Sequence, residues 1–299
     1  MTEEDVASRP PAGTVVGMRS VVYGLWTYFE FVVLALVFVP IMAGYYLVRR
    51  GDLRGRGGWM RRFGRTCARC SPIWDFQVEG QAPGDVKRMP YVVVANHESS
   101  ADPFLLSWLP FDMRWVAKVS LFKLPVIGWL MRLGGDIRLQ RGDGASVRAM
   151  LAEARATLDG GLPVMIFPEG TRSPDGALQR FKDGAFHLAI EAGVPILPLA
   201  IEGTRACRPK GSLWFRVASA RVRVLEPIST VGCTLADLPR LREDTRSAIR
   251  DALVDLRQHP VEMVPEPEAI SAAISELVAE VASALDANEP VTAGSSGRG

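Results

Sequence analysis

Cysteine is scarce in this 299-residue chain, which has four cysteines, and the formal net charge is only +2. Four cysteines are few for a disulfide scaffold. The pair Cys67-x-x-Cys70 has a spacing known from zinc and redox sites, but Cys207 and Cys233 are too far apart to form a second pair of ligands. So small a net charge argues against a broad nucleic-acid-binding surface. We therefore expect neither a metal site nor a nucleic-acid partner.

The signatures of three common classes of protein are also missing. The sequence has no Gly-x-Ser-x-Gly elbow, which argues against a serine hydrolase with a covalent acyl-enzyme. It has no Walker lysine pattern, and the glycines at 142–144 lack the third glycine of a dinucleotide fingerprint because Val147 holds that place. The acidic residues at positions 3–5 do not suit the basic start of a secretory signal. Each of these three classes is therefore disfavoured.

One long apolar run is present, at residues 21–48. About 20 apolar residues can cross the hydrocarbon core of a bilayer, and the aromatic residues near both ends of the run suit the membrane interface. Glu30 and Pro40 interrupt the run, since a carboxylate at membrane depth is costly and proline kinks or ends a helix. The run therefore predicts a kinked span, a short hairpin or a half-buried interfacial pair, with a buried helix of a soluble protein as the alternative.

A strongly basic segment follows the apolar run. Residues 49–69 hold eight arginines and one acidic residue, Asp52. Basic residues beside an apolar segment mark the cytoplasmic side of a membrane and attract anionic headgroups. We therefore expect a membrane-bound protein whose remaining part faces the cytoplasm. The chain has 30 arginines and only five lysines, a bias typical of GC-rich bacteria, which favours a bacterial inner membrane.

The rest of the chain alternates between strand-like and helix-like patterns. Short apolar runs predict strands at 91–95, 114–117, 137–139, 163–167, 196–201 and 221–225. Helical spacing predicts helices at 145–158, 181–192 and 235–257, the second ending at Gly193. This alternation predicts an α/β domain with a mainly parallel central sheet flanked by helices. In such sheets functional groups lie at the carboxyl ends of the strands.

These patterns divide the chain into four parts. Residues 1–20 are expected to be disordered, and residues 21–72 to form a membrane helical segment with a basic linker. Residues 73–260 form the α/β domain. Residues 261–299 are expected to hold a C-terminal amphipathic helix at 266–287, followed by a disordered tail.

The first cluster with catalytic potential follows the predicted strand at 91–95. His97 stands just after that strand, and Asp102 comes five residues later. A turn of this length can fold the carboxylate back onto one imidazole nitrogen, which leaves the other nitrogen free as a general base. Acyl transfer to an alcohol needs such a base because a hydroxyl attacks a thioester only as its proton leaves. A histidine after a strand is usually structural, so this pair by itself is a weak signal.

Two loops with arginines accompany the pair. Residues 167–173 (FPEGTRS) follow a predicted strand and offer a threonine hydroxyl beside Arg172, a combination suited to phosphate. Residues 134–142 (GGDIRLQRG) carry Arg141 just after another strand. Arg141 and Arg172 could converge on one phosphate if their strands are neighbours, and Lys118 could add a further charge. Each arginine taken alone would be interpreted as part of a surface salt bridge.

Four ordered motifs resemble those of the glycerophospholipid acyltransferase family, in particular the 1-acylglycerol-3-phosphate acyltransferases. The motifs are residues 96–102 (NHESSAD), 134–141 (GGDIRLQR), 167–173 (FPEGTRS) and 194–201 (VPILPLAI). The segments at 117–128 and 181–184 also fit the pattern that links these motifs in the family. The resemblance covers about residues 70–230, in the right order and spacing.

The resemblance implies a function and a set of site residues. His97 would be the general base and Asp102 its orienting partner. The residues that would bind the phosphate of the acceptor are Arg141, Glu169, Gly170, Thr171 and Arg172, with Lys118 in support. The acyl donor would be acyl-CoA or acyl carrier protein, with no other cofactor. The partners would be membrane lipids and a lysophospholipid acceptor, and the product phosphatidic acid.

The second motif departs from the family pattern, which leaves the acceptor open. Arg138 stands where the family usually has phenylalanine, and Gln140 where it often has aspartate. Glycerol 3-phosphate or another lysolipid therefore remains an alternative acceptor. A membrane-attached binding module without catalytic activity is a further alternative.

Overall fold

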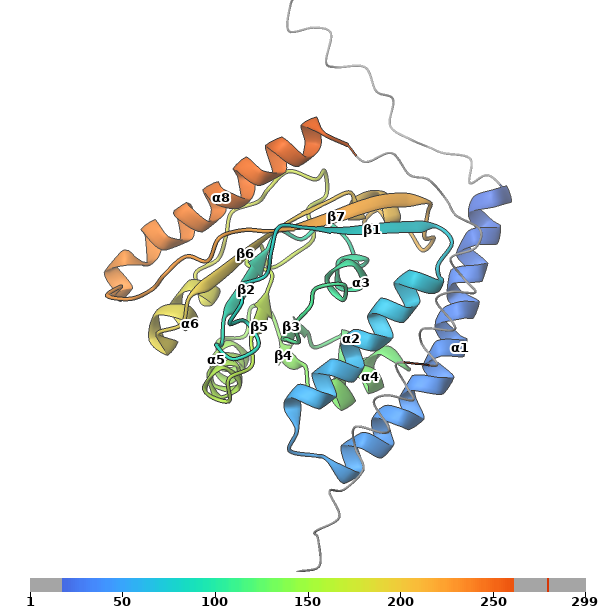
Figure 1. Cartoon of the computed structure of the whole chain (residues 1–299), viewed down its shortest axis with the longest axis horizontal. Helices are drawn as coiled ribbons and strands as arrows, with labels where there is room; N and C mark the ends of the chain where they lie inside the picture. The colour runs from blue at the N-terminus through green and yellow to red at the C-terminus, as the bar shows by residue number, and fades with distance from the viewer. Residues whose placement is uncertain (1–17, 261–278, 280–299) are drawn as a thin grey trace, which may run out of the picture.

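The structure is a computed structural model that describes residues 18–260 and residue 279. The described part of the chain begins with two helices, α1 (Met18–Val48) and α2 (Leu53–Cys70), and continues into an α/β domain (Figure 1). The predicted amphipathic helix at 266–287 and the predicted tail at 288–299 lie outside the described residues, apart from position 279. So does the predicted disordered N-terminus, except that residues 18–20 already belong to α1.

The domain is built on a seven-stranded sheet with the order β1-β7-β6-β2-β5-β3-β4. Neighbouring strands are parallel except for the antiparallel pair β6 and β7. The predicted fold class is therefore confirmed. The strands are β1 (Trp74–Glu79), β2 (Val92–Ala95), β3 (Arg114–Lys118), β4 (Ile137–Leu139), β5 (Val164–Ile166), β6 (Ile196–Glu202) and β7 (Ala218–Val224).

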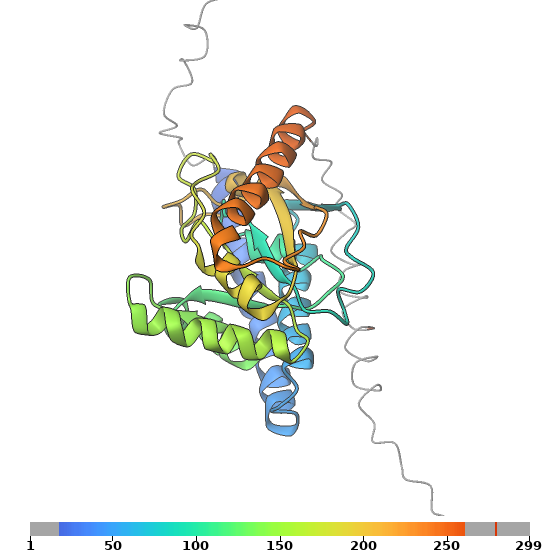
Figure 2. The same cartoon turned by 90° about the vertical axis from the view of Figure 1, so that its left-hand side faces the viewer.

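Helices cover both faces of the sheet, as Figures 1 and 2 show. Val92 and Val94 of β2 point to one face, where they pack with α5, α6 and α8. Val93 and Ala95 point to the other face, where α3 packs. All four residues are fully buried, as expected for a central strand covered on both sides. The helices of the domain are α3 (Asp102–Leu106), α4 (Ile127–Gly134), α5 (Gly144–Asp159), α6 (Gly184–Ala192), α7 (Thr204–Cys207) and α8 (Leu238–Gln258), with short 3₁₀ turns at Leu121–Lys123 and Leu235–Asp237.

The edge strand β1 was not predicted from the sequence. Its apolar residues Trp74, Phe76 and Val78 alternate with polar ones, so no continuous apolar run marks it. The alternation itself is the signal of a half-buried strand. β1 pairs in parallel with β7 along its whole length.

The apolar run at 21–48 lies in one continuous helix, so the prediction of a hairpin within it was wrong. Pro40 lies inside α1, which continues past it to Val48. Residues Tyr23–Val48 are long and apolar enough to cross a membrane, and only 22% of the most apolar window is buried. So exposed a helix does not fit the alternative of a core helix in a soluble protein.

The basic segment after α1 is a helix and not the predicted linker. Asp52 caps α2 by accepting a hydrogen bond from the backbone N–H of Gly55 at 2.8 Å. Trp59, Phe63 and Cys67 recur every four residues, and this apolar stripe packs against α1 and α4. Arginines separate these apolar residues in the sequence. The segment therefore looked uniformly basic, and its apolar stripe was not predicted.

Candidate active site

Three strands of the sheet end at the same edge, and the segments that follow them carry the polar residues of the site. β2 lies between β5 and β6 and is parallel to both, so their carboxyl ends meet. Residues 96–102 follow β2, residues 167–173 follow β5, and Thr204 follows β6. The loops that the sequence marked as separate motifs are therefore neighbours in space.

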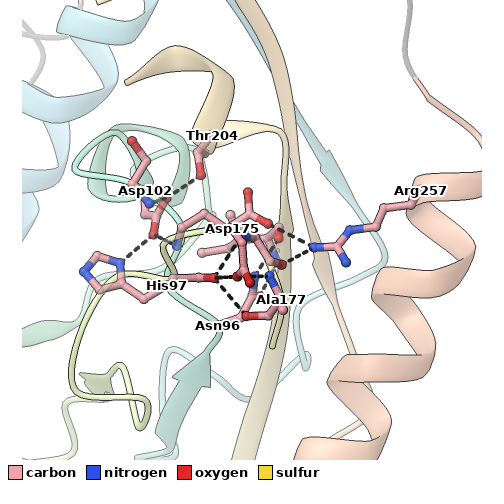
Figure 3. A network of polar contacts seen from close by, with 12 residues as sticks. Asn96, His97, Asp102, Asp175, Ala177, Thr204 and Arg257 are labelled. Carbon is pink, nitrogen blue, oxygen red and sulfur yellow. Dashed lines mark hydrogen bonds and ion pairs between the residues drawn. The ribbon is translucent and has the colours of Figure 1, made fainter. Parts of the chain in front are cut away.

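His97 and Asp102 are in direct contact, as predicted. Nδ1 of His97 lies 2.7 Å from Oδ2 of Asp102 (Figure 3). A carboxylate only accepts hydrogen bonds, so Nδ1 carries the proton and Nε2 keeps a free lone pair. The His97 side chain retains 16% exposure while that of Asp102 has none, so the imidazole is the part of the pair that can meet a substrate.

The buried Asp102 carboxylate receives three further hydrogen bonds. Backbone N–H groups of Glu98 and Ser99 donate to it at 3.0 and 3.1 Å, and the hydroxyl of Thr204 donates to Oδ1. These donors compensate for taking a charge out of water. They also fix the plane of the carboxylate, and with it the orientation of the His97 ring.

The loop after β5 holds the backbone of His97 on both sides. Oε1 of Glu169 accepts a hydrogen bond from the His97 N–H at 3.0 Å, and the Ser173 N–H donates to the His97 carbonyl at 2.8 Å. The ring of His97 also stacks on Phe167, with centroids 4.0 Å apart and planes 18° apart. The two backbone hydrogen bonds and the ring stacking together restrict the position of the imidazole.

The position of Glu169 differs from the one predicted for a phosphate ligand. Its side chain is turned inward, is only 4% exposed and contacts the backbone of the histidine. Burial raises the pKa of Glu169 to about 7. A carboxyl group would also repel a phosphate whenever it is ionised. In this structure the Glu169 side chain thus holds the backbone of His97.

The remaining residues of the loop face a cluster of basic groups. Gly170 has a φ of +71°, and a Cβ there would lie 2.7 Å from Nζ of Lys182. The left-handed backbone favours a glycine at this position, and the amine of Lys182 lies close to it. Lys182 was not among the predicted site residues, although it belongs to the linking pattern at 181–184. Thr171 and Arg172 are both partly exposed beside it.

Arg141 and Arg172 are close enough to influence each other electrostatically. Burial first, and then the charge of Arg172, hold the pKa of Arg141 below its usual range. The convergence of the two arginines was predicted on the condition that their strands are neighbours, but β3 lies between β4 and β5. Within residues 18–260 neither guanidinium forms an ion pair with an acidic side chain, so the two charges suit a bound anion. Lys118 is exposed at the end of the intervening strand β3.

Two further residues, Asn96 and Arg257, support the loops of the site through hydrogen bonds. The side chain of Asn96 bridges to β6, with its amide group donating to the Ile201 carbonyl and accepting from the Ile201 N–H, both at 2.8 Å. Arg257 of α8 lies 3.4 Å from the buried carboxyl of Glu98 and donates to the Gly176 carbonyl at 2.7 Å (Figure 3). No local sequence signal marks Arg257 or Thr204, because both reach the site only through the fold.

Among the described residues, no group of three or more His, Cys, Asp or Glu side chains could hold a metal ion. Cys67 and Cys70 are free thiols buried on α2, where burial raises the pKa of both.

Comparison with known proteins finds a similarity over the part of the chain that carries these residues. Residues 76–202 match the Acyltransferase family. The chain is 38% identical to a 1-acyl-sn-glycerol-3-phosphate acyltransferase of Chlamydomonas reinhardtii over 49% of this chain and 44% of that one. It is 34% identical to the human 1-acyl-sn-glycerol-3-phosphate acyltransferase beta over 58% of this chain and 63% of that one. The chain thus spans less than two thirds of the length of these relatives.

A solved structure extends the similarity beyond residues 76–202. The crystal structure of the 1-acyl-sn-glycerophosphate acyltransferase PlsC from Thermotoga maritima matches with a TM-score of 0.65 and 28% identity. The match covers 81% of this chain and 100% of the Thermotoga chain. It therefore takes in the mostly parallel sheet together with much of the surrounding helical structure.

Proposed function

Because residues 76–202 match the Acyltransferase family, we propose that the chain transfers a fatty acyl group to the free hydroxyl of 1-acylglycerol 3-phosphate, giving phosphatidic acid. The donor is acyl-CoA or acyl carrier protein. The observation that supports this most directly is the 2.7 Å contact between His97 and Asp102 at the strand edge that also carries Arg141 and Arg172. A base and an anion-binding cluster side by side are what a phosphorylated alcohol requires.

In the proposed reaction Nε2 of His97 takes the proton of the acceptor hydroxyl. The hydroxyl oxygen forms a bond to the thioester carbonyl carbon, and the carbon–sulfur bond then breaks. Nε2 returns its proton to the leaving thiolate, which departs as a thiol. Asp102 stabilises the imidazolium that exists between these two steps.

Arg141 and Arg172 bind the phosphate of the acceptor in this proposal, with Gly170, Thr171 and Lys118 in support. Lys182 joins them because its amine lies against Gly170. Two guanidinium groups can each donate paired hydrogen bonds to phosphate oxygens, which fixes the hydroxyl relative to Nε2. Glu169 acts through the backbone of His97 and not on the substrate.

We also propose that the protein is bound to a bacterial inner membrane with its catalytic domain on the cytoplasmic face. The long apolar helix α1 supports membrane association. The arginines of α2 that follow it support a cytoplasmic orientation. A membrane location brings the site to its lipid acceptor and leaves the product in the bilayer.

An acceptor panel tests the proposed substrate. Purified protein would be assayed with one labelled acyl-CoA and, in turn, 1-acylglycerol 3-phosphate, glycerol 3-phosphate and other lysolipids. We expect the highest kcat/KM for 1-acylglycerol 3-phosphate. A higher value for glycerol 3-phosphate would transfer the proposal to that acceptor.

Replacement of the histidine separates an enzyme from a binding module. His97→Ala should lower acyl transfer by about 10²–10⁴-fold, the contribution typical of a general base, while vesicle binding persists. His187→Ala is the matched control, because His187 lies on α6 beside Glu191 and away from the dyad. Full activity of His97→Ala would exclude the general-base role.

A further inference from the structure

The connection between β6 and β7, residues 203–217, combines basic charge with exposed apolar side chains. It holds four basic residues and no acidic one. Near its C-terminal end Leu213 is 70% exposed and Val217 is 43% exposed. Arg216 is partly exposed, and the exposed Lys210 donates a hydrogen bond to the Arg172 carbonyl at 3.2 Å. Apolar side chains next to uncompensated positive charge are the pattern of a surface that meets an anionic lipid leaflet.

This connection is seated on the N-terminal half of α1. The hydroxyl of Tyr28 donates a hydrogen bond to the Leu213 carbonyl at 2.5 Å. The Trp214 ring packs directly on the backbone of Gly24, where a Cβ would lie 2.5 Å from Cε3 of the indole. The Tyr28 ring also contacts Phe215, with centroids 5.8 Å apart. The connection is therefore fixed against the apolar helix.

The part of α1 that carries these contacts is itself strongly exposed. Leu25, Phe29 and Val32 expose 57%, 61% and 53% of their surface. They lie within four residues of Gly24 or Tyr28, to which the connection is bound. The exposed apolar surface of α1 thus continues onto Leu213.

At its other end the connection is bound to the catalytic turn. The hydroxyl of Ser99 donates to the Arg208 carbonyl at 2.9 Å, and the Arg208 guanidinium donates to the hydroxyl of Ser100 at 3.1 Å. Both serines lie between His97 and Asp102. Because the Arg208 guanidinium also donates to the Ser212 carbonyl at 3.0 Å, hydrogen bonds link residues 210–217 to the turn that carries the dyad.

We propose that residues 210–217 are a second membrane contact of this protein, in addition to α1. Leu213 and Val217 enter the boundary between headgroups and acyl chains, and Lys210 and Arg216 meet the phosphates of an anionic leaflet. The contact holds the turn of His97 at the leaflet surface, where a lipid acceptor arrives. The proposal does not depend on which acyl transfer the site performs.

A fluorescent probe on the connection tests this contact independently of α1. The full chain with Cys233→Ser and Leu213→Cys would be labelled with an environment-sensitive dye, since the other three cysteines are buried. The matched control is Val231→Cys in the same background. Val231 is 89% exposed and follows Ile228, which pairs with the first residue of β6, at the opposite end of that strand.

We expect the dye at position 213 to shift to shorter wavelength on vesicles of equimolar phosphatidylcholine and phosphatidylglycerol. Lipids with nitroxide-labelled acyl chains should quench it there and leave the dye at position 231 unquenched. Lys210→Gln combined with Arg216→Gln should reduce the quenching on anionic vesicles more than on vesicles of phosphatidylcholine alone.

Three outcomes would overturn the proposal. The first is an unchanged emission at position 213 while the protein still sediments with vesicles. The second is a shift without nitroxide quenching, which would indicate that a second copy of the chain covers the connection. The third is equal quenching at positions 213 and 231. If the variant with Lys210→Gln and Arg216→Gln lost the same amount of quenching on both vesicle types, the two basic residues would have no role in binding anionic headgroups.

Discussion

The hydroxyl of Thr204 donates a hydrogen bond to Oδ1 of Asp102, although 102 residues separate them in the sequence. Both residues are fully buried. Thr204 begins α7 directly after β6, and Asp102 begins α3 after the turn that follows β2. The bond thus joins the ends of two parallel strands and makes the orientation of the dyad depend on both.

Replacing this threonine with valine should weaken catalysis without weakening substrate binding. Thr204→Val keeps the shape of the side chain and removes one donor from the buried carboxylate. A hydrogen bond to a charged group contributes roughly 1.5–3 kcal/mol, so we expect kcat to fall by about tenfold or more. Steady-state kinetics would measure kcat and the KM of each substrate.

Thr245→Val is the matched control for that variant. Thr245 is equally buried, but its hydroxyl donates only to the Leu241 carbonyl within α8. If both variants lost the same activity and the same thermal stability, the effect of Thr204 would be one of packing alone. The role of Thr204 in orienting Asp102 would then be excluded.

The central strands and the dyad could be predicted because their signals are local. Residues 92–95 form an unbroken apolar run, and His97 and Asp102 belong to one turn. Their contact depends on only a few backbone angles, so the spacing of five residues was enough to predict it. The helix at 145–158 was predicted for a similar reason, since its apolar spacing is contained within one segment.

Contacts between residues that are far apart in the sequence could not be predicted. Arg257 reaches Glu98 because α8 packs over β6, and nothing in the neighbourhood of either residue in the sequence indicates this pairing. Glu169 lies in a recognised motif, yet its side chain turns inward to the backbone of His97, in the loop after another strand. The motif identified Glu169 as important but did not reveal its role.

The paired arginines predict a selective effect on the acceptor. Arg172→Glu would replace one of the two positive charges with a negative one beside the phosphate. We expect the KM of the acceptor to rise by about tenfold or more, the effect of losing roughly 1.4 kcal/mol, with little change in the KM of the donor. Initial rates with each substrate varied in turn would measure both constants.

Arg155→Gln serves as the control, because Arg155 pairs with Asp159 on α5 and takes no part in the cluster. Similar increases in the KM of donor and acceptor for Arg172→Glu would argue against a phosphate site. The same change in the Arg155 variant would indicate a general effect of charge.

Three buried carboxyl groups should make the protein less stable as the pH rises. Burial is the first cause in each case, and it raises the pKa of Glu98 to about 8 and the pKa values of Asp136 and Glu169 to about 7. Between the ordinary carboxyl pKa and these raised values, the folded state binds more protons than the unfolded state. The free energy of unfolding therefore falls with pH over that window.

Glu98→Gln should flatten this dependence, because the amide stays neutral at every pH. We expect the Tm of the unaltered protein to fall between about pH 5 and about pH 9, and the Tm of the variant to fall less. Calorimetry of both proteins, with the exposed Glu243→Gln as the control, would measure the difference. Parallel curves for Glu98→Gln and the unaltered protein would show that Glu98 is already ionised at the low end of the window. In that case Arg257, 3.4 Å away, would outweigh the burial of the carboxyl group.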